Sequence, residues 1–258
     1  MPGPLSGARL SLEERKTIQR CPHFVPRWAN HPVLATSPVK EVIEECLLAP
    51  ESVFIEMAWN RIVIRNFRLK ICDLFYPPDG REPLADPLFV AGYRNMIGSF
   101  LSGFSRALVH AAGVALDSRA AVFLGPDDAG KTTVARSATL RPVLSDDHLL
   151  ITHDGGQSMA HATPFGNLTA GPNSARVGAF FVLEKSSAFE IEPMRQAEFF
   201  EFLWEQAGHT KYTLPREDAV AHLDLLRAIS RSAPVFRMRF ERNFINWDAI
   251  DSAMLKGA

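Results

Sequence analysis

The sequence lacks the features that define several large classes of protein. Its three cysteines, Cys21, Cys46 and Cys72, are widely spaced and form no CxxC pair, which argues against a disulfide framework and favours a reducing compartment. No apolar run approaches the roughly 20 residues of a membrane-spanning helix, and residues 1–20 carry charges where a signal peptide would be apolar. We therefore expect a cytoplasmic protein that has no membrane partner.

The sequence also lacks an excess of charge of either sign. The 28 Lys and Arg residues nearly balance the 29 Asp and Glu residues, so the net charge is −1. Such a balance provides no basic field for nucleic acid, and we expect no nucleic-acid partner. Internal repeats and low-complexity tracts are absent as well, so any function has to be read from individual motifs.

The first third of the chain predicts a small α+β region over residues 1–85. Residues 38–48 have the apolar spacing of a short helix, whereas residues 52–59 and 61–76 alternate between apolar and polar side chains as half-buried strands do. A turn-rich break follows at residues 77–83. We find no motif that carries chemistry in this region.

Residues 86–258 predict a second, α/β domain in which helices and strands alternate. Pro87 is well placed at the start of a long helix, and the run at 177–185 is apolar enough for a central strand. The expected helices are 86–108, 131–138, 193–207, 216–230 and 247–255; the expected strands are 109–116, 120–124, 142–145, 177–185 and 234–240, with a hairpin that turns at 154–156.

The strongest motif is the stretch GPDDAGKTT at residues 125–133, which satisfies the Walker A pattern GxxxxGK[ST]. An apolar strand precedes the loop and a helix-competent segment follows it, so backbone amides and a helix N-terminus would converge on phosphate oxygens. Lys131 would reach the β- and γ-phosphates, and the Thr132 hydroxyl would bind Mg²⁺. We therefore expect ATP and Mg²⁺ as cofactors, bound by Gly125, Asp127, Asp128, Ala129, Gly130, Lys131, Thr132 and Thr133.

Two carboxylates within an anion-binding loop are unusual. Since the phosphates would bind backbone amides, the side chains of Asp127 and Asp128 need not face them. Asp tolerates a left-handed backbone, so a conformational role is sufficient for Asp128. For Asp127 two interpretations stay open: simple exposure to solvent, and a role on the acceptor or metal side of the site.

A second pair of acids, Asp146 and Asp147, follows a short strand. Phosphoryl transfer commonly uses one carboxylate for the metal and another for the acceptor hydroxyl. Because adjacent residues of an extended segment point to opposite faces, we expect the two to have different roles.

The stretch from LVHAAGVAL to LSDDHLLI resembles the HPr kinase/phosphorylase-like proteins, a P-loop group related in fold to phosphoenolpyruvate carboxykinase. The resemblance covers roughly residues 105–205 and implies a mixed β-sheet core of that type. It implies that Asp147 is the base for the acceptor hydroxyl, that His110 lies near the transferred phosphate, and that Asp146 and Thr132 serve the metal. The segment TPFGN…VGAFFVLEK is similar to the kinases of peptide-modifying gene clusters.

The chain departs from the family pattern in three places. Asp128 replaces the usual glycine of the loop, Asn167 and Thr169 lie where a metal-binding glutamate is expected, and the C-terminal arginine motif of the bifunctional enzymes is not evident. These departures argue against HPr as the substrate and against a reverse reaction.

Other residues that invite a functional interpretation are better explained by structure. His148, His153 and His161 do not show the spacing of a closed zinc site, because His148 and His153 would face opposite sides of one strand. Trp59, Trp204 and the phenylalanines near Trp204 are predicted to be core residues.

Three functions remain for comparison. The leading prediction is an ATP- and Mg²⁺-dependent kinase, with Asp147, His110 and Lys131 as catalytic residues, that acts on a serine of a peptide or small protein. The alternatives are a small-molecule or nucleotide kinase, in which Asp127 would meet a sugar hydroxyl, and a non-catalytic ATP-binding module. A homo-oligomer is compatible with each of them.

Overall fold

The computed structural model describes residues 53–58, 61–66, 71–75, 94, 97, 98, 101, 105–166, 168, 171–207, 216–241 and 244–256. The chain divides into two compact units, residues 1–96 and 97–258, which are described separately. The predicted boundary between residues 85 and 86, like the predicted helix at 38–48, lies outside the described residues.

The described part of the first unit is a three-stranded antiparallel sheet. It consists of β1 (Val53–Ala58), β2 (Arg61–Asn66) and β3 (Ile71–Phe75), in the order β1-β2-β3. Ile64 is opposite Ile55 of β1 and Asp73 of β3. The alternating pattern at residues 52–59 and 61–76 therefore predicted strand structure correctly, but it did not divide the second run into β2 and β3.

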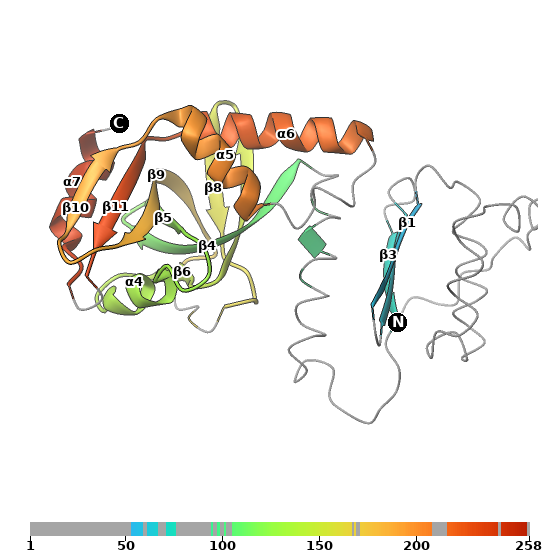
Figure 1. The fold of residues 1–258 in the computed structure, drawn as a ribbon, viewed down its shortest axis with the longest axis horizontal. Helices are drawn as coiled ribbons and strands as arrows, with labels where there is room; N and C mark the ends of the chain where they lie inside the picture. The colour runs from blue at the N-terminus through green and yellow to red at the C-terminus, as the bar shows by residue number, and fades with distance from the viewer. Residues whose placement is uncertain are drawn as a thin grey trace, which may run out of the picture. The chain divides into compact units, whose positions relative to one another are not determined.

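The second unit contains an eight-stranded mixed sheet (Figure 1). The strand order is β10-β11-β9-β5-β4-β7-β8, and β6 pairs with β4. The strands are β4 (Arg106–Leu116), β5 (Arg119–Leu124), β6 (Val143–Ser145), β7 (His148–Asp154), β8 (Gln157–His161), β9 (Ser174–Lys185), β10 (Glu190–Pro193) and β11 (Val235–Phe240). Only β5–β9 and β9–β11 are parallel among these pairings. The expectation of an α/β fold with a mixed sheet is confirmed at this level.

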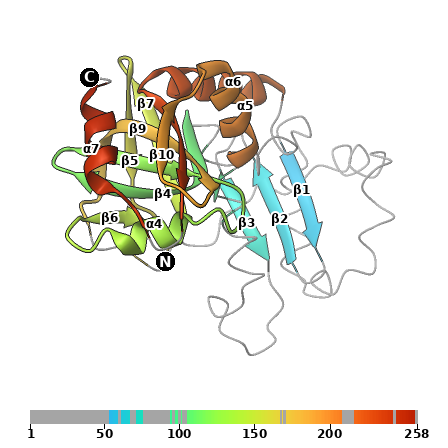
Figure 2. The same cartoon turned by 60° about the vertical axis from the view of Figure 1, so that its left-hand side comes forward.

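Strand β9 closes part of this sheet on itself. Its first residues, 174–176, pair with β8, whereas the following residues pair with β5. The strands β9, β5, β4, β7 and β8 therefore form a closed circuit, and β10 and β11 extend the sheet beyond β9. Figure 2 shows the neighbouring strands β9, β5 and β4 of this sheet.

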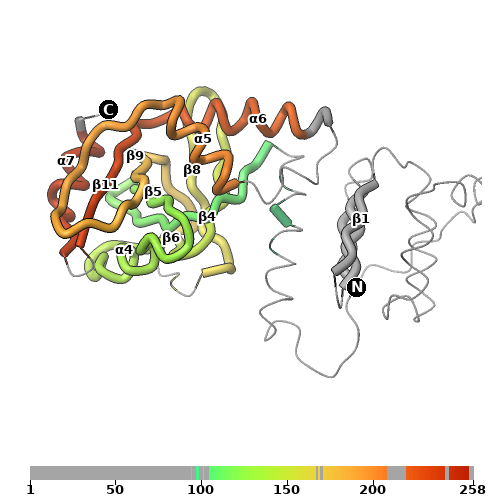
Figure 3. Tube along the Cα trace, in the orientation of Figure 1, coloured from blue at the N-terminus to red at the C-terminus, as the bar shows by residue number. Residues whose placement is uncertain are grey.

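Helices cover both faces of the sheet. They are α4 (Lys131–Ser137), α5 (Gln196–Gln206), α6 (Arg216–Arg231) and α7 (Trp247–Lys256). One core joins Phe180 to residues of α5 and α6, and the other joins Phe181 to residues of α4 and α7. Because neighbouring residues of a strand point to opposite faces, the apolar run of β9 supplies both cores at once. Figure 3 shows α5 and α6 running together along one side of the chain trace.

Most predicted elements of this unit form, including the hairpin between β7 and β8. Its two turn residues, Gly155 and Gly156, have φ angles of 54° and 79°, as a tight two-residue hairpin requires. None of the described helices is long and apolar enough to cross a membrane.

Two of the predicted elements were wrong at their boundaries. The helix expected over 86–108 is described only at residues 94, 97, 98 and 101, and β4 already begins at Arg106. Ser105 has a φ of 58°, a left-handed backbone through which a regular helix cannot continue. Leu108 was assigned to the helix because a run buried on both faces gives no clear periodicity.

The helix expected from Pro193 was also placed too early. Residues 190–193 form β10, and α5 begins at Gln196. Strand β10 is an edge strand whose acids pair with arginines of β11: Arg239 with Glu190 at 2.9 Å, and Arg237 with Glu192 at 3.4 Å. Its polar composition conceals a strand that is stabilised by ion pairs across the sheet.

Candidate functional site around the loop 125–130

The loop joins the end of β5 to the start of α4, as the motif requires. A Cβ on Gly125 would lie 2.4 Å from the Cβ of Ala129, so only glycine fits the close turn there. Gly130 has φ of 107°, and a Cβ on it would lie 2.7 Å from Cζ of Phe240. Both glycines of the motif are therefore required by the shape of the loop.

Asp128 has a φ of 63°, which confirms the left-handed backbone expected for it. Gly130 is the N-cap of α4, and the first turn of this helix contains no acidic residue. The helix therefore begins without a carboxylate that would compete with an anion for its first amides.

Lys131 is bent back onto the loop. Its side chain is buried, and Nζ donates hydrogen bonds to the carbonyl oxygens of Gly125 at 2.7 Å and Pro126 at 2.9 Å. Burial lowers the pKa of the ammonium group, and the carboxylates of Asp127, Asp147 and Asp128 oppose this shift. The lysine is thus held at the loop by acceptors that a phosphate oxygen could replace.

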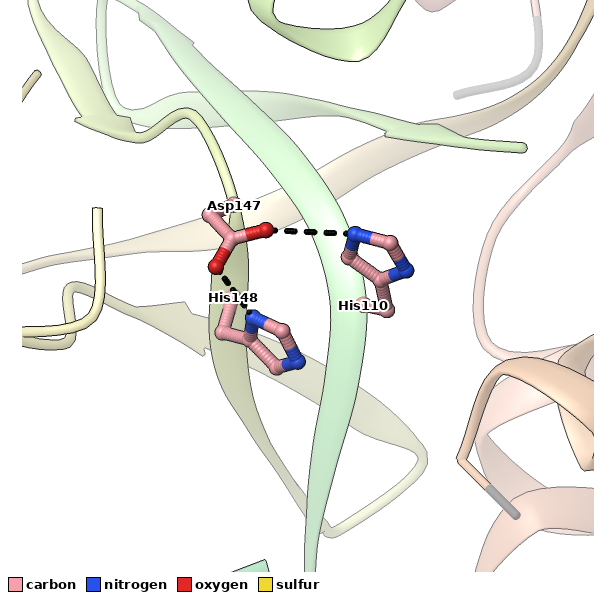
Figure 4. Close-up of side chains that lie close together, drawn as sticks. All are labelled: His110, Asp147 and His148. Atoms are coloured by element: carbon pink, nitrogen blue, oxygen red, sulfur yellow. Dashed lines mark hydrogen bonds and ion pairs between the residues drawn. The ribbon is translucent and has the colours of Figure 1, made fainter. Parts of the chain in front are cut away.

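His110, Asp147 and His148 form a hydrogen-bonded cluster beside the loop (Figure 4). Nε2 of His110 lies 3.1 Å from one carboxylate oxygen of Asp147, and Nδ1 of His148 lies 2.9 Å from the other. The two imidazole rings stack, with centroids 4.9 Å apart and planes at 15°. Their closeness follows from the sheet, because His110 and His148 are directly opposite each other on β4 and β7.

The carboxylate of Asp147 is held in its charged form. Burial raises its pKa. Hydrogen bonds from His110 and His148 and the charges of both histidines lower the pKa by a larger amount, so it lies well below its usual range. The three residues also offer one ligand atom each within 4.8 Å of one another, a geometry that a metal ion could use. In the described structure the same nitrogen and oxygen atoms satisfy one another.

Asp127 extends towards this cluster from the opposite side. Its Oδ1 is 3.7 Å from Nδ1 of His110, yet its side chain is 93% exposed. His110 therefore lies between Asp147 and Asp127. The exposure predicted by one interpretation of Asp127 is observed, and a role on the acceptor or metal side stays a prediction.

Asp146 and Asp147 lie in a bend between β6 and β7, so the alternation of faces expected for an extended segment does not apply to them, although their environments differ. Asp146 is buried, and its Oδ1 accepts a hydrogen bond from the amide of Leu168 at 3.1 Å. The hydroxyl of Thr132 donates to the backbone carbonyl of Asp146 at 3.5 Å. A hydroxyl and a carboxylate together are oxygen ligands of the kind that Mg²⁺ prefers, so the two residues fit this metal in chemical type.

These groups line one cavity of about 580 Å³. All the site residues proposed from the sequence line this cavity except Gly125. They are His110, Asp127, Asp128, Ala129, Gly130, Lys131, Thr132, Thr133, Asp146 and Asp147. Lys185, Ser186 and Phe240 complete the lining. The structure thus gathers the predicted residues around one space.

Sequence reasoning missed four residues of this site: His148, Lys185, Ser186 and Phe240. His148 was considered only as a zinc ligand, and its partner across the sheet is not visible in the sequence. Lys185 adds a second cation to the cavity, at the end of the strand parallel to β5. The strand that ends at Lys185 was predicted, so this lysine could have been expected near the loop. Asn167 and Thr169, which were noted in place of a family glutamate, lie outside the described residues.

A second cavity, of about 750 Å³, adjoins the first at Asp127, Asp128, Ala129 and Lys185. It lies between the loop, the end of β9 and helix α5. Its apolar lining includes Met194 and Phe202, and its acids are Asp127, Asp128, Glu184, Glu198, Glu201 and Glu205. Carboxylates outnumber the two cations, Lys185 and Arg237, so this cavity is acidic.

Comparisons with known proteins place the chain in no family. No family model matches it, and no curated protein matches it either. A solved structure that it resembles weakly is the Hpr(Ser) kinase/phosphatase from Coxiella burnetii, with a TM-score of 0.30 and 10% sequence identity. The match covers 58% of this chain and 93% of the other. A likeness of this size carries no argument on function, which therefore rests on the geometry of the site.

Proposed function

We propose that the chain is an ATP- and Mg²⁺-dependent kinase that transfers the γ-phosphate to a hydroxyl group, that of a serine in a peptide or small protein. One observation carries this proposal: a single cavity is lined by both residues 127–133 and the pair His110–Asp147. A phosphate-binding loop and a charged carboxylate facing it are the parts that phosphoryl transfer requires.

On the nucleotide side, Lys131 would exchange its present acceptors, the carbonyls of Gly125 and Pro126, for oxygens of the β- and γ-phosphates. The charge of the phosphates would favour the ammonium form against the effect of burial. Thr132 and Asp146 would hold Mg²⁺, which neutralises charge on the phosphate oxygens when bound.

On the acceptor side, Asp147 would accept a hydrogen bond from the hydroxyl group. A carboxylate with such a low pKa is a weak base, but phosphoryl transfer passes through a loose transition state in which orientation matters more than early proton removal. The hydroxyl oxygen forms a bond to the γ-phosphorus, the bond to the β-phosphate oxygen breaks, and ADP leaves. The hydroxyl proton passes to the carboxylate as the new bond forms.

The acidic cavity beside the loop suggests the character of the acceptor. It adjoins the catalytic cavity at the crest of the loop and provides space for more than a small alcohol. The exposed carboxylates of Glu201 and Glu205, on one side of α5, would attract a cationic segment. We therefore propose a basic peptide as the acceptor.

The test is a single-turnover assay with ATP, Mg²⁺ and serine-containing basic peptides, followed by mass spectrometry for one added phosphoryl group. Asp147→Asn removes the carboxylate charge at the acceptor, whereas Asp127→Asn is a matched change on the exposed loop. The proposal predicts that Asp147→Asn slows transfer strongly while ATP binding is kept. Full transfer by this variant would eliminate Asp147 as the base.

The position of Asp127 supports a second candidate, a nucleotide kinase in which this carboxylate binds a sugar hydroxyl. Its Oδ1 lies beside His110, at the entrance to the cavity. The same assay with nucleoside monophosphates separates the two, because in that case Asp127→Asn would be the more damaging change. Stabilisation by Mg-ATP without ADP formation from any acceptor would instead indicate a non-catalytic binding module.

A further inference from the structure

A third cavity, of about 450 Å³, lies at the opposite end of the sheet from the loop. It is lined by the first residues of β5 and β9 and by residues 231–234, which lead into β11. These three strands are parallel to one another, so their amino ends meet here. Strand β5 has six residues, which places the cavity about 20 Å from the phosphate loop.

Three arginines from distant parts of the sequence meet at this cavity: Arg119, Arg176 and Arg231. Arg119 and Arg176 are directly opposite each other on β5 and β9, an arrangement of like charges that costs free energy unless an anion compensates for it. Arg231 comes from the last turn of α6. The cavity is lined by no acidic residue of the described chain.

The absence of carboxylates distinguishes these arginines from others in the same sheet. Arg237 is paired with Glu184, Glu192 and Glu198, and Arg239 likewise has glutamate partners. By contrast, no acid among the described residues lies within ion-pair distance of Arg119, Arg176 or Arg231. Arg237 and Arg239 of β11 therefore have carboxylate partners, whereas the three arginines beside the amino end of β11 have none among the described residues.

The packing fixes Arg119 in place without a carboxylate. A Cβ on Gly178 would lie 3.1 Å from the Cβ of Arg119 and 2.5 Å from Cε of Met254, so the absent side chain leaves room for the arginine. The guanidinium group of Arg119 donates one hydrogen bond, at 3.4 Å, to the carbonyl of Met254. Most of its N–H donors therefore remain available to a ligand.

We propose that this cavity binds a small molecule that carries phosphate groups. Guanidinium groups match phosphate oxygens with paired, charge-assisted hydrogen bonds, and three arginines line this cavity together with Gln196. Ser232 adds no donor, because both its amide and its hydroxyl donate to the carbonyl of Ile229. The volume suits a small anion such as a diphosphate group, and the site is independent of the proposed kinase activity.

The test is isothermal titration of the full chain with inorganic pyrophosphate at fixed ionic strength. Because the phosphate loop is a second potential site, the measurement is made in parallel on a Lys131→Ala variant. We expect one pyrophosphate to bind to this variant, and we expect Arg119→Gln, Arg176→Gln and Arg231→Gln, each added to it, to weaken binding by about tenfold. The matched control is Arg227→Gln, which changes an exposed arginine on α6 that is paired with Asp224.

Three results would overturn the proposal: no binding of pyrophosphate to the Lys131→Ala variant, retention of affinity in all three arginine variants, or an equal loss in the Arg227→Gln control. Arg176 and Arg231 are exposed, so their substitution leaves folding intact, which circular dichroism checks. A parallel titration with citrate distinguishes phosphate from carboxylate ligands. Equal affinity for citrate would overturn the choice of phosphate.

Discussion

The two ends of the parallel strands β5, β9 and β11 carry opposite charges. At the carboxyl end, the loop cavity is lined by the carboxylates of Asp127, Asp128, Asp146 and Asp147, whereas at the amino end three arginines surround a cavity without an acid among the described residues. The charges at the carboxyl end are largely compensated, since two histidines hold Asp147 and the amide of Leu168 binds Asp146. The arginines at the amino end are not.

This contrast shows what a balanced composition conceals. The net charge of −1 excludes a large basic surface, and the sequence was interpreted in that way. It does not exclude local separation of charge, because the sheet brings residues from different segments to each of its ends. Since ligands of open α/β sheets usually bind at the carboxyl ends of the strands, the amino-end cavity is the less expected of the two.

The largest effect should follow from removing the cation of the loop. Lys131→Ala deletes the ammonium group that would bind the transferred phosphate, and we expect phosphoryl transfer to fall by about 1,000-fold. Pyrophosphate binding at the amino end should be unchanged in this variant. Turnover assays and calorimetry on the same protein check both statements, and loss of both activities would show that the two ends are not independent.

Acidification should destabilise α6, the helix whose last turn lies at the amino-end cavity. Burial lowers the pKa of His222 in α6 to about 4. Because this folded-state value is below the unfolded one, its stabilising effect is complete above pH 6.5 and is lost as the pH falls towards 4, by about 3 kcal/mol. Urea unfolding at pH 7 and pH 4 measures the loss. His222→Leu should reduce the difference in the free energy of unfolding between pH 7 and pH 4. An unchanged difference in this variant would contradict the assignment to His222.

The acceptor side of the loop should be more sensitive at Asp147 than at Asp127. We expect Asp147→Asn to lower the single-turnover rate by about 100-fold, because the amide no longer accepts the hydroxyl proton. Asp127→Asn should change it only a few-fold, because an exposed ion pair contributes little. Equal effects would contradict this ranking, and a larger effect of Asp127→Asn would favour the nucleotide-kinase candidate.

Replacing Gly130 should cost more stability than replacing the glycine of an ordinary turn. Gly130→Ala adds a Cβ at φ of 107° and against Phe240, so we expect a loss of about 3 kcal/mol in the free energy of unfolding. Gly155→Ala is the control, since φ is also positive there but nothing lies within 4 Å of the added Cβ. It should cost about 1 kcal/mol. Equal losses in urea unfolding would show that Phe240 does not restrict the loop.

The smallest effect is expected from the acidic cavity. The substitutions Glu201→Gln and Glu205→Gln remove two exposed charges, and we expect KM for a basic peptide to rise about threefold while kcat stays constant. The effect should vanish for a neutral peptide. A fall in kcat would instead indicate that α5 takes part in the chemical step.

Much of the carboxyl-end site was predictable because it is encoded locally. The loop is a contiguous motif, its strand and helix follow from neighbouring residues, and the left-handed Asp128 follows from what aspartate tolerates. His110 was placed there only by resemblance to a family, whereas Asp147 was also placed by its position after a short strand, and the structure puts the two 3.1 Å apart. Their catalytic roles stay predictions.

The remaining features depend on pairing between distant segments. His148 joins the site through its register with His110, and Arg119 meets Arg176 through the register of β5 with β9. Register is set by the packing of the whole sheet and is not written in either strand alone. For the same reason β10 was mistaken for the approach to a helix, because its strand character depends on the arginines of β11.

The contact between Gly130 and Phe240 has a consequence for the order in which the protein is made. The loop sequence leaves the ribosome early, but the ring that limits its shape belongs to β11, more than a hundred residues later. A nascent chain that ends before β11 holds every residue of the motif without the surface that supports it. The loop therefore has the surface that supports its final shape only after β11 has been made.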